Sequence, residues 1–345
     1  MIDPTLVNRI REFIGSARDP DDGAFVTLCR AVARAQGRLG AGSGLEAIEP
    51  VPEGAFKLSD VAHFPRSRAQ ATFRTSGTTT GRPGLHLVRD MDLYRRSALA
   101  GFERYLLYPP RPGRFVSLIP PAPQRPGSSL SHMVSMVMEA FAGEQATFAR
   151  KGNALALTPL MAAVREAVDS REPLVLLGTS LDLLTLFEAL EHSNTANVAL
   201  PRGSRVMHTG GDKASGRAIT REKIWQGLDR YFQIPPEDVV EEFGMTELLS
   251  QAYDAPRVVP GQRRLVPVPW MRTRVLDPTT FTEVDSGSRG LLCHYDLANC
   301  HTAVAVLTSD LGLRINEGFS HIHRVPGSTP RGCSHEAARG VRTHV

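Results

Sequence analysis

The chain has 345 residues, a formal net charge of +4 and 41% hydrophobic residues, values that describe a globular protein large enough to bury a core. Its 40 Lys and Arg residues are scattered among 36 Asp and Glu residues, so the charge pattern does not indicate a nucleic-acid-binding face. No stretch approaches the roughly 20 apolar residues that cross a bilayer, and the charged N-terminus does not resemble a secretory signal.

The cysteines give a second compositional constraint. Four of them are spread along the chain: Cys29, Cys293, Cys300 and Cys333. They form no CxxC pair and show no spacing typical of metal ligands. We therefore expect a reduced, cytoplasmic protein without a membrane segment, in which any special cysteine serves for its reactivity rather than as a cross-link.

The first 60 residues predict helices, one starting at Asp3–Pro4 and another over residues 31–38. From about residue 65 the pattern alternates between strands and helices. Buried strands are expected over residues 114–120, 174–178, 204–208 and 239–243, and helices over residues 128–141 and 182–191. Thr179 or Ser180 is positioned to cap the second of these helices.

After Arg264 the pattern changes to short strands separated by turns. Strands that alternate with helices predict an α/β core with a parallel sheet, whose ligands bind at the carboxyl ends of its strands. The later part predicts a smaller antiparallel subdomain. We expect a helical segment over residues 1–60, a core over residues 61–325 and a short tail over residues 326–345.

A run rich in hydroxyl groups and glycines is the strongest local signal. Its backbone N–H groups and hydroxyls can converge on an anion, and its arginine adds a fixed positive charge. The GxxxxGK[ST] pattern of a Walker A loop is absent, and the alternative is a flexible linker. The predicted phosphate-binding residues are Thr75, Ser76, Gly77, Thr78, Thr79, Thr80, Gly81 and Arg82.

Three later motifs contain groups that suit a nucleotide. The sequence Phe-Gly-Met-Thr-Glu at residues 243–247 offers the carboxylate of Glu247 to a hard cation. The sequence His-Thr-Gly-Gly-Asp at residues 208–212 contains a glycine turn, and Thr-Ser-Asp-Leu-Gly at residues 308–312 contains a carboxylate that can accept two hydroxyl hydrogen bonds. The alternatives are an exposed loop glutamate at Glu247 and ordinary turns at the other two motifs.

Together these motifs, in this order, resemble those of the adenylate-forming superfamily of acyl-CoA synthetases, peptide-synthetase adenylation domains and luciferases. The resemblance implies that Glu247 binds Mg²⁺ and that Thr246 contacts the α-phosphate of ATP. It also implies that Gly210 and Gly211 lie beside the adenine and that Asp310 binds the ribose hydroxyls. The sequence departs from the superfamily pattern at Thr80, which lengthens the loop, and at Gly84, which replaces a usual lysine.

Longer segments resemble one branch of the superfamily, the acyl-protein synthetases of the LuxE type. They include VMHTGGDKASGRAITREKIW, PPEDVVEEFGMTELLSQAYD, GLLCHYDLAN and HRVPGSTPRGCS, within a resemblance over residues 65–336. This implies the large N-terminal domain of an adenylate-forming synthetase, with the C-terminal swinging domain absent or vestigial. Members activate a fatty acid as acyl-AMP and transfer the acyl group to a cysteine, whose position Cys333 matches.

Several charged residues have predicted supporting roles. Arg324 and Arg331 are close to Cys333 in sequence and favour its thiolate, and Arg324 is also assigned to the cofactor-binding set. Without a catalytic lysine domain, Lys213, Arg217 and Arg82 are expected to offset charge in the adenylation step, with solvated surface charges as the alternative.

A helix expected after the phosphate loop opens with Ser-Leu-Ser-His-Met at residues 129–133 and is rich in Met and Val. In the superfamily such a helix borders the acid pocket, so His132 is predicted to approach the carboxylate or the α-phosphate. The alternative is a capped helix with an ordinary core face, since methionine also fills cores.

The sequence thus predicts an enzyme that uses ATP and Mg²⁺ to activate a small carboxylic acid, with a fatty acid as the expected substrate. The acyl group then passes to a thiol, either Cys333 or a thiol of an acyl-accepting protein or reductase subunit. One alternative is an adenylating ligase that delivers its acyl-AMP to an amine or a carrier protein. Another is a non-catalytic nucleotide-binding subunit of a reductase complex, against which the retention of both Glu247 and Asp310 argues.

Overall fold

The computed structural model describes residues 2–16, 21–75, 83–152, 154–210 and 219–322, and the chain divides into two units. Unit 1 comprises Met1–Ser97, Met245–Gln251 and Val266–Val345, and unit 2 comprises Ala98–Gly244 and Ala252–Leu265. Each unit is therefore assembled from segments that are far apart in the sequence. The division expected at residues 60 and 325 stays a prediction.

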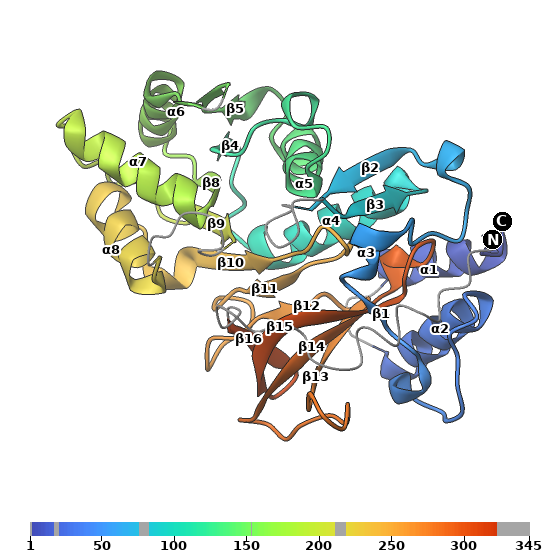
Figure 1. Cartoon of the computed structure of the whole chain (residues 1–345). Helices are drawn as coiled ribbons and strands as arrows, with labels where there is room; N and C mark the ends of the chain where they lie inside the picture. Colours follow the sequence, from blue (N-terminus) through green and yellow to red (C-terminus); the bar gives the residue numbers. More distant parts are fainter. Residues whose placement is uncertain (1, 17–20, 76–82, 153, 211–218, 323–345) are drawn as a thin grey trace. The chain divides into compact units, whose positions relative to one another are not determined.

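Helices and strands alternate through the middle of the chain, and strands dominate its later part (Figure 1). The helices are α1 (Pro4–Ser16), α2 (Asp22–Ala35), α3 (Ala55–Leu58), α4 (Met91–Leu106), α5 (Ser129–Val137), α6 (Leu157–Ser170), α7 (Ser180–His192) and α8 (Arg221–Phe232). The strands of unit 2 are β4 (Arg114–Ser117), β5 (Ala146–Phe148), β6 (Arg150–Lys151), β7 (Ala154–Leu155), β8 (Leu174–Thr179), β9 (Arg205–Thr209), β10 (Val239–Phe243) and β11 (Ala252–Asp254). Those of unit 1 are β1 (Val51–Pro52), β2 (Ala71–Arg74), β3 (Leu85–Val88), β12 (Val266–Pro267), β13 (Met271–Leu276), β14 (Arg289–Asp296), β15 (Ala305–Ile315) and β16 (Gly318–Ile322).

The main sheet of unit 2 has the predicted parallel arrangement. Its strands follow the order β11-β10-β9-β8-β4-β5, in which β11 runs antiparallel to β10 and the other neighbours are parallel. Strands β4, β8, β9 and β10 consequently end at the same edge of the sheet. That edge is where a parallel sheet of this kind places its ligands.

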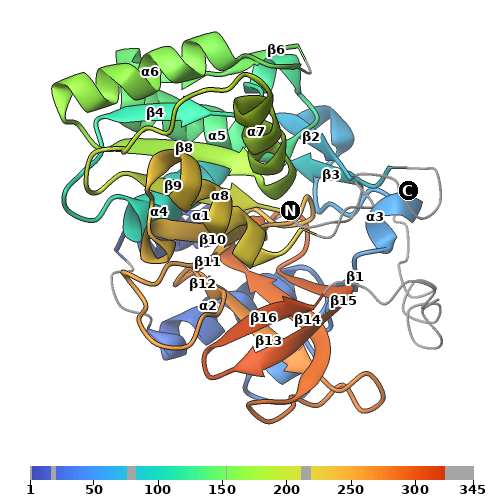
Figure 2. The ribbon, with the colours of Figure 1, turned by 90° about the vertical axis from the view of Figure 1, so that its left-hand side faces the viewer.

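Both faces of this sheet are buried, which explains why its strands are continuous apolar runs in the sequence. On one face Val116, Leu176 and Val206 belong to a core cluster with the apolar sides of α6, α7 and α8, which cover the sheet in Figure 2. On the other face Phe115 lies near Phe102 of α4, with ring centroids 6.2 Å apart.

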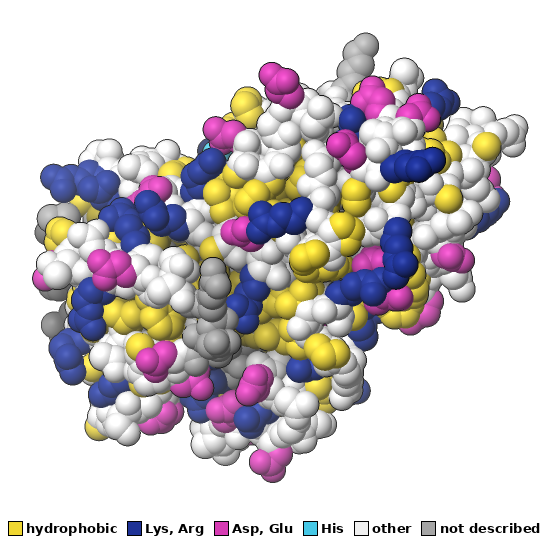
Figure 3. Space-filling model, turned by 180° about the vertical axis from the view of Figure 1, so that it is seen from behind, with side chains coloured by type: hydrophobic (Ala, Val, Ile, Leu, Met, Phe, Trp, Pro, Cys, Tyr) yellow, Lys and Arg dark blue, Asp and Glu magenta, His cyan; other side chains and the backbone are white. Residues whose placement is uncertain are grey.

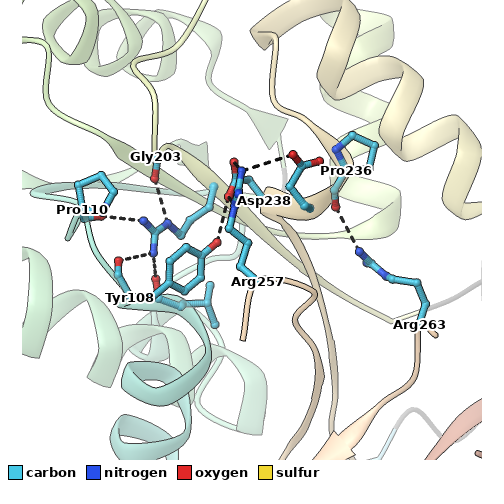
Figure 4. Close-up of polar contacts among 10 residues, drawn as sticks. Tyr108, Pro110, Gly203, Pro236, Asp238, Arg257 and Arg263 are labelled. Carbon is cyan, nitrogen blue, oxygen red and sulfur yellow. Dashed lines mark hydrogen bonds and ion pairs between the residues drawn. The ribbon is translucent and has the colours of Figure 1, made fainter. Parts of the chain in front are cut away.

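A buried arginine lies at the opposite, amino-terminal edge of the parallel strands, at the start of β9. Its partners include Tyr108, Pro110 and Gly203, which are labelled in Figure 4. Arg205 begins β9, is 0% exposed, and its guanidinium lies 3.8 Å from the ring centre of Tyr108. It donates hydrogen bonds to the backbone carbonyls of Gly203 (2.9 Å), Tyr108 (2.9 Å), Pro110 (2.7 Å) and Leu106. Because ligands bind at the other edge of such sheets, we interpret Arg205 and the four carbonyl groups that it binds as a structural cluster.

One carboxyl group of the sheet, that of Glu242, has a raised pKa. Glu242 of β10 is 4% exposed and stands in register with Thr209 of β9 and Tyr253 of β11. Burial raises the pKa of Glu242 to about 7, although a hydrogen bond with the Thr209 side chain acts in the opposite direction.

Unit 1 contains the predicted antiparallel subdomain. Strands β13, β14 and β15 are antiparallel in succession, β16 pairs with β15, and β1 adds a parallel strand from the early part of the chain. A separate antiparallel pair, β2 and β3, flanks the predicted phosphate loop in the sequence. The two apolar runs that flank that loop in the sequence therefore pair with each other.

Most expected elements are confirmed, and several have different bounds. The strand predicted over residues 114–120 ends at Ser117, as β4. The helix predicted over residues 31–38 begins earlier, as α2, because the Asp21 side chain caps the N–H of Ala24. The helix predicted over residues 128–141 is α-helical only to Val137 and continues as a π turn over Met138–Ala142. Thr179 caps α7 in a reciprocal capping box with Asp182, which settles the choice between Thr179 and Ser180.

The surface shows the mixed charge expected from the sequence. On the face drawn in Figure 3, Lys and Arg side chains alternate with Asp and Glu side chains and with small apolar areas. None of the helices in the described residues combines the length and the apolar character that crossing a membrane requires.

Replacing Arg205 by Met is expected to lower the free energy of unfolding by about 3 kcal/mol or more, because four backbone carbonyl groups lose the hydrogen-bond donor that Arg205 supplies. Arg230→Met is the matched control, since the Arg230 side chain is 59% exposed and its ion pair with Glu191 contributes at most about 1 kcal/mol. Urea unfolding of both variants measures the difference. Equal losses in the free energy of unfolding would contradict the structural role of Arg205.

Replacing Glu242 by Gln is expected to raise the melting temperature at about pH 8 and to change it less at about pH 4. The ordinary pKa of this carboxyl is 4.5 and the folded value is about 7, so the unfolded chain ionises first as the pH rises. Stability attributable to the protonated group is therefore lost between these values and stays lost above them. Melting curves across this range test the idea, and a difference that is independent of pH would contradict it.

Candidate active site

The predicted phosphate loop connects the two strands of the β2–β3 hairpin. Arg74 and Leu85 form the last register pair, and Thr75 and Gly84 close the mouth of the loop directly beyond it. The Thr75 N–H donates to the Gly84 carbonyl (3.0 Å), and the Gly84 N–H donates to the Thr75 hydroxyl (2.7 Å). A Cβ at Gly84 would lie 3.2 Å from the Thr75 hydroxyl oxygen, so a side chain there would crowd the loop mouth.

The segment that carries Thr246 and Glu247 is irregular and is held by side chains. The Thr246 carbonyl accepts a hydrogen bond from Nδ1 of His86 (2.6 Å), and the Glu247 carbonyl accepts one from Nδ2 of Asn299 (2.8 Å). His86 and Asn299 are both 0% exposed, and Glu247 is 7% exposed. The backbone bearing the two predicted phosphate and metal ligands is therefore fixed from inside unit 1.

The same segment is held further along by Asp296. Its carboxylate accepts hydrogen bonds from the Leu249 N–H (2.8 Å) and the Ser250 hydroxyl (2.6 Å). Ser250 in turn accepts from Ser97 (2.9 Å), whose hydroxyl accepts from the indole N–H of Trp270 (2.8 Å). Burial raises the pKa of Asp296 to about 6, and the hydrogen bonds from Ser250, Leu249 and Ala298 favour the ionised form.

Asp310 lies in a strand rather than in the turn that was the alternative. It belongs to β15 and is 3% exposed. The register between β14 and β15 shifts between Leu291 and Cys293, and the Thr308 hydroxyl fills this irregularity by donating to the Leu292 carbonyl (3.0 Å). The motif therefore occupies a β-bulge, a feature that redirects side chains locally.

In unit 2, the glycine turn follows β9 at the carboxyl edge of the parallel sheet. Gly210 has φ of +74°, a conformation that favours glycine. Its carbonyl accepts a hydrogen bond from the Ser180 hydroxyl (2.6 Å), which also lies 3.0 Å from Nδ1 of His208. Because the hydroxyl has one proton, His208 must donate from Nδ1, and burial lowers the pKa of His208 to about 4, which keeps it neutral.

His132 lies on α5, and its Nε2 atom is 3.1 Å from the Pro126 carbonyl in the preceding loop. Met133, Val134 and Val137 on the same helix are each 2% exposed or less. Their burial accounts for the apolar side of α5 as a core face, so this side does not by itself indicate an acid tunnel. The proximity of His132 to an acid stays a prediction.

Many predicted site residues lie outside the part of the chain that the structure describes. They are Ser76, Gly77, Thr78, Thr79, Thr80, Gly81, Arg82, Gly211, Lys213, Arg217, Arg324, Arg331 and Cys333. Of the other predicted ligands, unit 1 contains Thr75, Thr246, Glu247 and Asp310, and unit 2 contains Gly210 and His132.

Sequence reasoning did not identify His86, Asn299 and Asp296. One signal was available, since all three are polar residues inside otherwise apolar stretches, Leu-His-Leu-Val and Leu-Leu-Cys-His-Tyr-Asp-Leu-Ala-Asn. A polar residue in such a stretch needs a partner, because an unpaired buried polar group destabilises the fold. The sequence did not indicate that the partner would be the segment at residues 245–251.

The residues present suit a nucleotide with a divalent cation. Glu247 supplies a carboxylate, the type of oxygen ligand that Mg²⁺ prefers. Thr75 and Gly84 are hydrogen-bonded to each other, and the sequence between them is rich in hydroxyl groups and glycines. Among the described residues no group of three or more His, Cys, Asp and Glu side chains could hold a metal by itself.

Solved structures with similar folds include two CoA ligases and MatB. A 2-hydroxyisobutyryl-CoA ligase in complex with 2-HIB-AMP has a TM-score of 0.59 and 16% identity, over 94% of this chain and 68% of that chain. A long-chain-fatty-acid-CoA ligase from Archaeoglobus fulgidus has a TM-score of 0.54 and 16% identity, over 76% and 52% of the two chains. ATP-bound MatB from Rhodopseudomonas palustris has a TM-score of 0.52 and 17% identity, over 75% and 48%.

The chain thus spans about two thirds of the first of these structures and about half of the other two. At identities this low, the structural similarity shows the fold alone. It confirms the predicted α/β architecture of the adenylate-forming synthetases. No curated protein matches the chain. The family model described as "Acyl-protein synthetase, LuxE" matches residues 114–335, well over half of the sequence, and the chain therefore belongs to the LuxE acyl-protein synthetase family.

Proposed function

We propose that this protein uses ATP and Mg²⁺ to activate a fatty acid as its acyl-adenylate and then transfers the acyl group to a thiol. The observation that carries the proposal is the family match over residues 114–335, which includes Glu247, Asp310 and Cys333. The hairpin that presents Thr75 and Gly84 lies upstream of the match and adds the phosphate-binding loop that the reaction requires.

The nucleotide would be held by residues with distinct chemical roles. The loop from Thr75 to Arg82 binds the phosphates through hydroxyls, N–H groups and one guanidinium, and Thr246 contacts the α-phosphate. Asp310 accepts hydrogen bonds from the ribose hydroxyls, and Gly210 with Gly211 lies beside the adenine. Glu247 holds Mg²⁺, which supplies charge neutralisation to the phosphate oxygens.

The first step joins the acid to the α-phosphorus. A carboxylate oxygen of the acid forms a bond to this phosphorus while the bond to the bridging oxygen breaks and pyrophosphate leaves. The negative charge that develops on the phosphate oxygens is stabilised by fixed donors, which is the usual source of most of the rate in such reactions. His132 orients the carboxylate of the acid in this scheme.

The second step needs an accessible thiolate, and Cys333 is the favoured acceptor. Cys29, Cys293 and Cys300 are each 0% exposed, and burial raises the pKa of each thiol. A buried thiol of raised pKa is a poor nucleophile. The Cys333 thiolate would attack the acyl carbonyl and displace AMP, with Arg324 and Arg331 favouring the ionised sulfur.

The test of the proposed function is acid-dependent exchange of labelled pyrophosphate into ATP, with panels of fatty, aryl and amino acids. Exchange that depends on fatty acids supports the proposal. Exchange that depends on another acid class would change the assigned substrate to that class. The absence of exchange with every acid would favour a non-catalytic nucleotide-binding subunit.

Replacing Glu247 by Gln is expected to reduce the exchange rate about 100-fold or more, because the neutral amide is a poor ligand for Mg²⁺. Glu317→Gln is the control, since Glu317 is an exposed glutamate of the same unit and should leave the rate unchanged. Exchange kinetics over a range of Mg²⁺ concentrations provide the measurement. Full activity of the Glu247 variant would overturn the metal assignment.

Replacing Cys333 by Ser is expected to leave exchange within about twofold of the parent and to abolish covalent labelling by a radiolabelled fatty acid, because adenylation precedes acyl transfer. Labelling is read on a denaturing gel after treatment with ATP and Mg²⁺. Cys293→Ala, which changes a buried thiol, should still be labelled. Undiminished labelling of the Cys333 variant would move the acceptor to another group.

A further inference from the structure

The irregular segment Met245–Gln251 contains Thr246 and Glu247, and its shape depends on groups outside it. It contains no helix or strand, so regular ladder hydrogen bonds do not fix its backbone. Buried backbone groups need partners, and in this segment three of them are side chains of other elements. His86 and Asn299 bind the Thr246 and Glu247 carbonyls, and Asp296 binds the Leu249 N–H.

The partner of Thr246 comes from the strand that leaves the phosphate loop. His86 is the second residue of β3 and pairs with Phe73 of β2 in the hairpin register. Its ring is held edge-on by Phe56 and Phe73, with centroid distances of 5.6 and 6.5 Å. The imidazole therefore cannot move without the hairpin that carries the loop, and it bonds Thr246 at 2.6 Å.

The chemistry of this hydrogen bond fixes the state of the histidine. A carbonyl oxygen only accepts, so Nδ1 must carry the proton. Burial lowers the pKa of His86 to about 4, so the neutral Nδ1–H form persists across ordinary pH. The donor to Thr246 is consequently permanent rather than switched by pH.

Asn299 adds a second support for the segment. Its Nδ2 group donates to the Glu247 carbonyl (2.8 Å) and to the Ala303 carbonyl (2.9 Å), which uses both amide protons. These bonds tie Glu247 to the turn between β14 and β15, and β15 also bears Asp310. Three elements that carry predicted nucleotide ligands are thus joined through two buried side chains.

We propose that His86 is a positioning residue that couples the phosphate loop hairpin to Thr246 and Glu247, with Asn299 as its counterpart on the β14–β15 side. The inference rests on the proposed function, because its effect is exerted through the groups assigned to the α-phosphate and to Mg²⁺. His86 touches neither the nucleotide nor the metal in this scheme. It fixes the backbone from which their ligands project.

The test compares three variants in acid-dependent ATP–pyrophosphate exchange. His86→Leu removes the donor at similar volume and is expected to lower kcat about 10- to 100-fold and to raise the Mg²⁺ concentration for half-maximal exchange, because small misplacements of catalytic groups have effects of this size. His86→Asn places an amide N–H where Nδ1 was and is expected to stay within about fivefold of the parent.

His294→Leu is the matched control. His294 is also 0% exposed in unit 1, but its ring nitrogen Nδ1 lies 2.9 Å from the hydroxyl of Thr273 on β13. A loss of packing should lower stability in both Leu variants, whereas only His86→Leu should shift the Mg²⁺ dependence. Equal Mg²⁺ dependence in the His86→Leu, His86→Asn and His294→Leu proteins would overturn the inference.

If His86→Leu does not fold, His86→Gln replaces it, since its amide reaches the position of Nε2 rather than that of Nδ1. The same shift is expected, and a Gln variant equal to the Asn variant would overturn the inference. A parent chain that shows neither exchange nor binding of MgATP by calorimetry would refute the proposed function and this inference together. A parent with normal exchange and unresponsive variants would refute the inference alone.

Discussion

The hydrogen bond between His86 and Thr246 is the interaction on which the arrangement of unit 1 depends. It joins residues 160 positions apart and connects strand β3 of the hairpin to the irregular segment Met245–Gln251. Two buried rings hold the histidine, and burial keeps it neutral. Because a backbone carbonyl inside the protein must be paired, this contact cannot be lost without destabilising the segment that bears Glu247.

Unit 2 uses its parallel sheet in two opposite ways. At the amino edge, Arg205 donates hydrogen bonds to carbonyl groups of two segments, Gly203 before β9 and Tyr108 and Pro110 after α4, and so has a structural role. At the carboxyl edge, Ser180 and His208 hold the turn at Gly210, whose positive φ excludes most other residues. The direction of the strands decides which edge is available for chemistry. Ligands of such a sheet bind beyond the carboxyl ends of its strands, where the following loops begin.

The cysteines illustrate how burial separates inert from reactive groups. In the described part of the chain each thiol is enclosed and its pKa is raised, so a thiolate is disfavoured where it would meet no substrate. Acyl transfer as proposed needs the opposite, an accessible sulfur beside positive charge. In the sequence, Arg324 and Arg331 lie close to Cys333 and would supply that positive charge.

The sequence by itself determined the α/β class, the strand Val239–Phe243, a helix cap at Thr179 or Ser180 and the order of the nucleotide motifs, because these depend on local periodicity and on residue types that one segment supplies. Only the tertiary structure decided that Asp310 occupies a bulge and that His86, Asn299 and Asp296 support the Thr246–Glu247 segment. Hydrogen bonds between distant segments leave no periodic signal. Their partners are chosen when chain packing buries a polar group and desolvation makes pairing necessary.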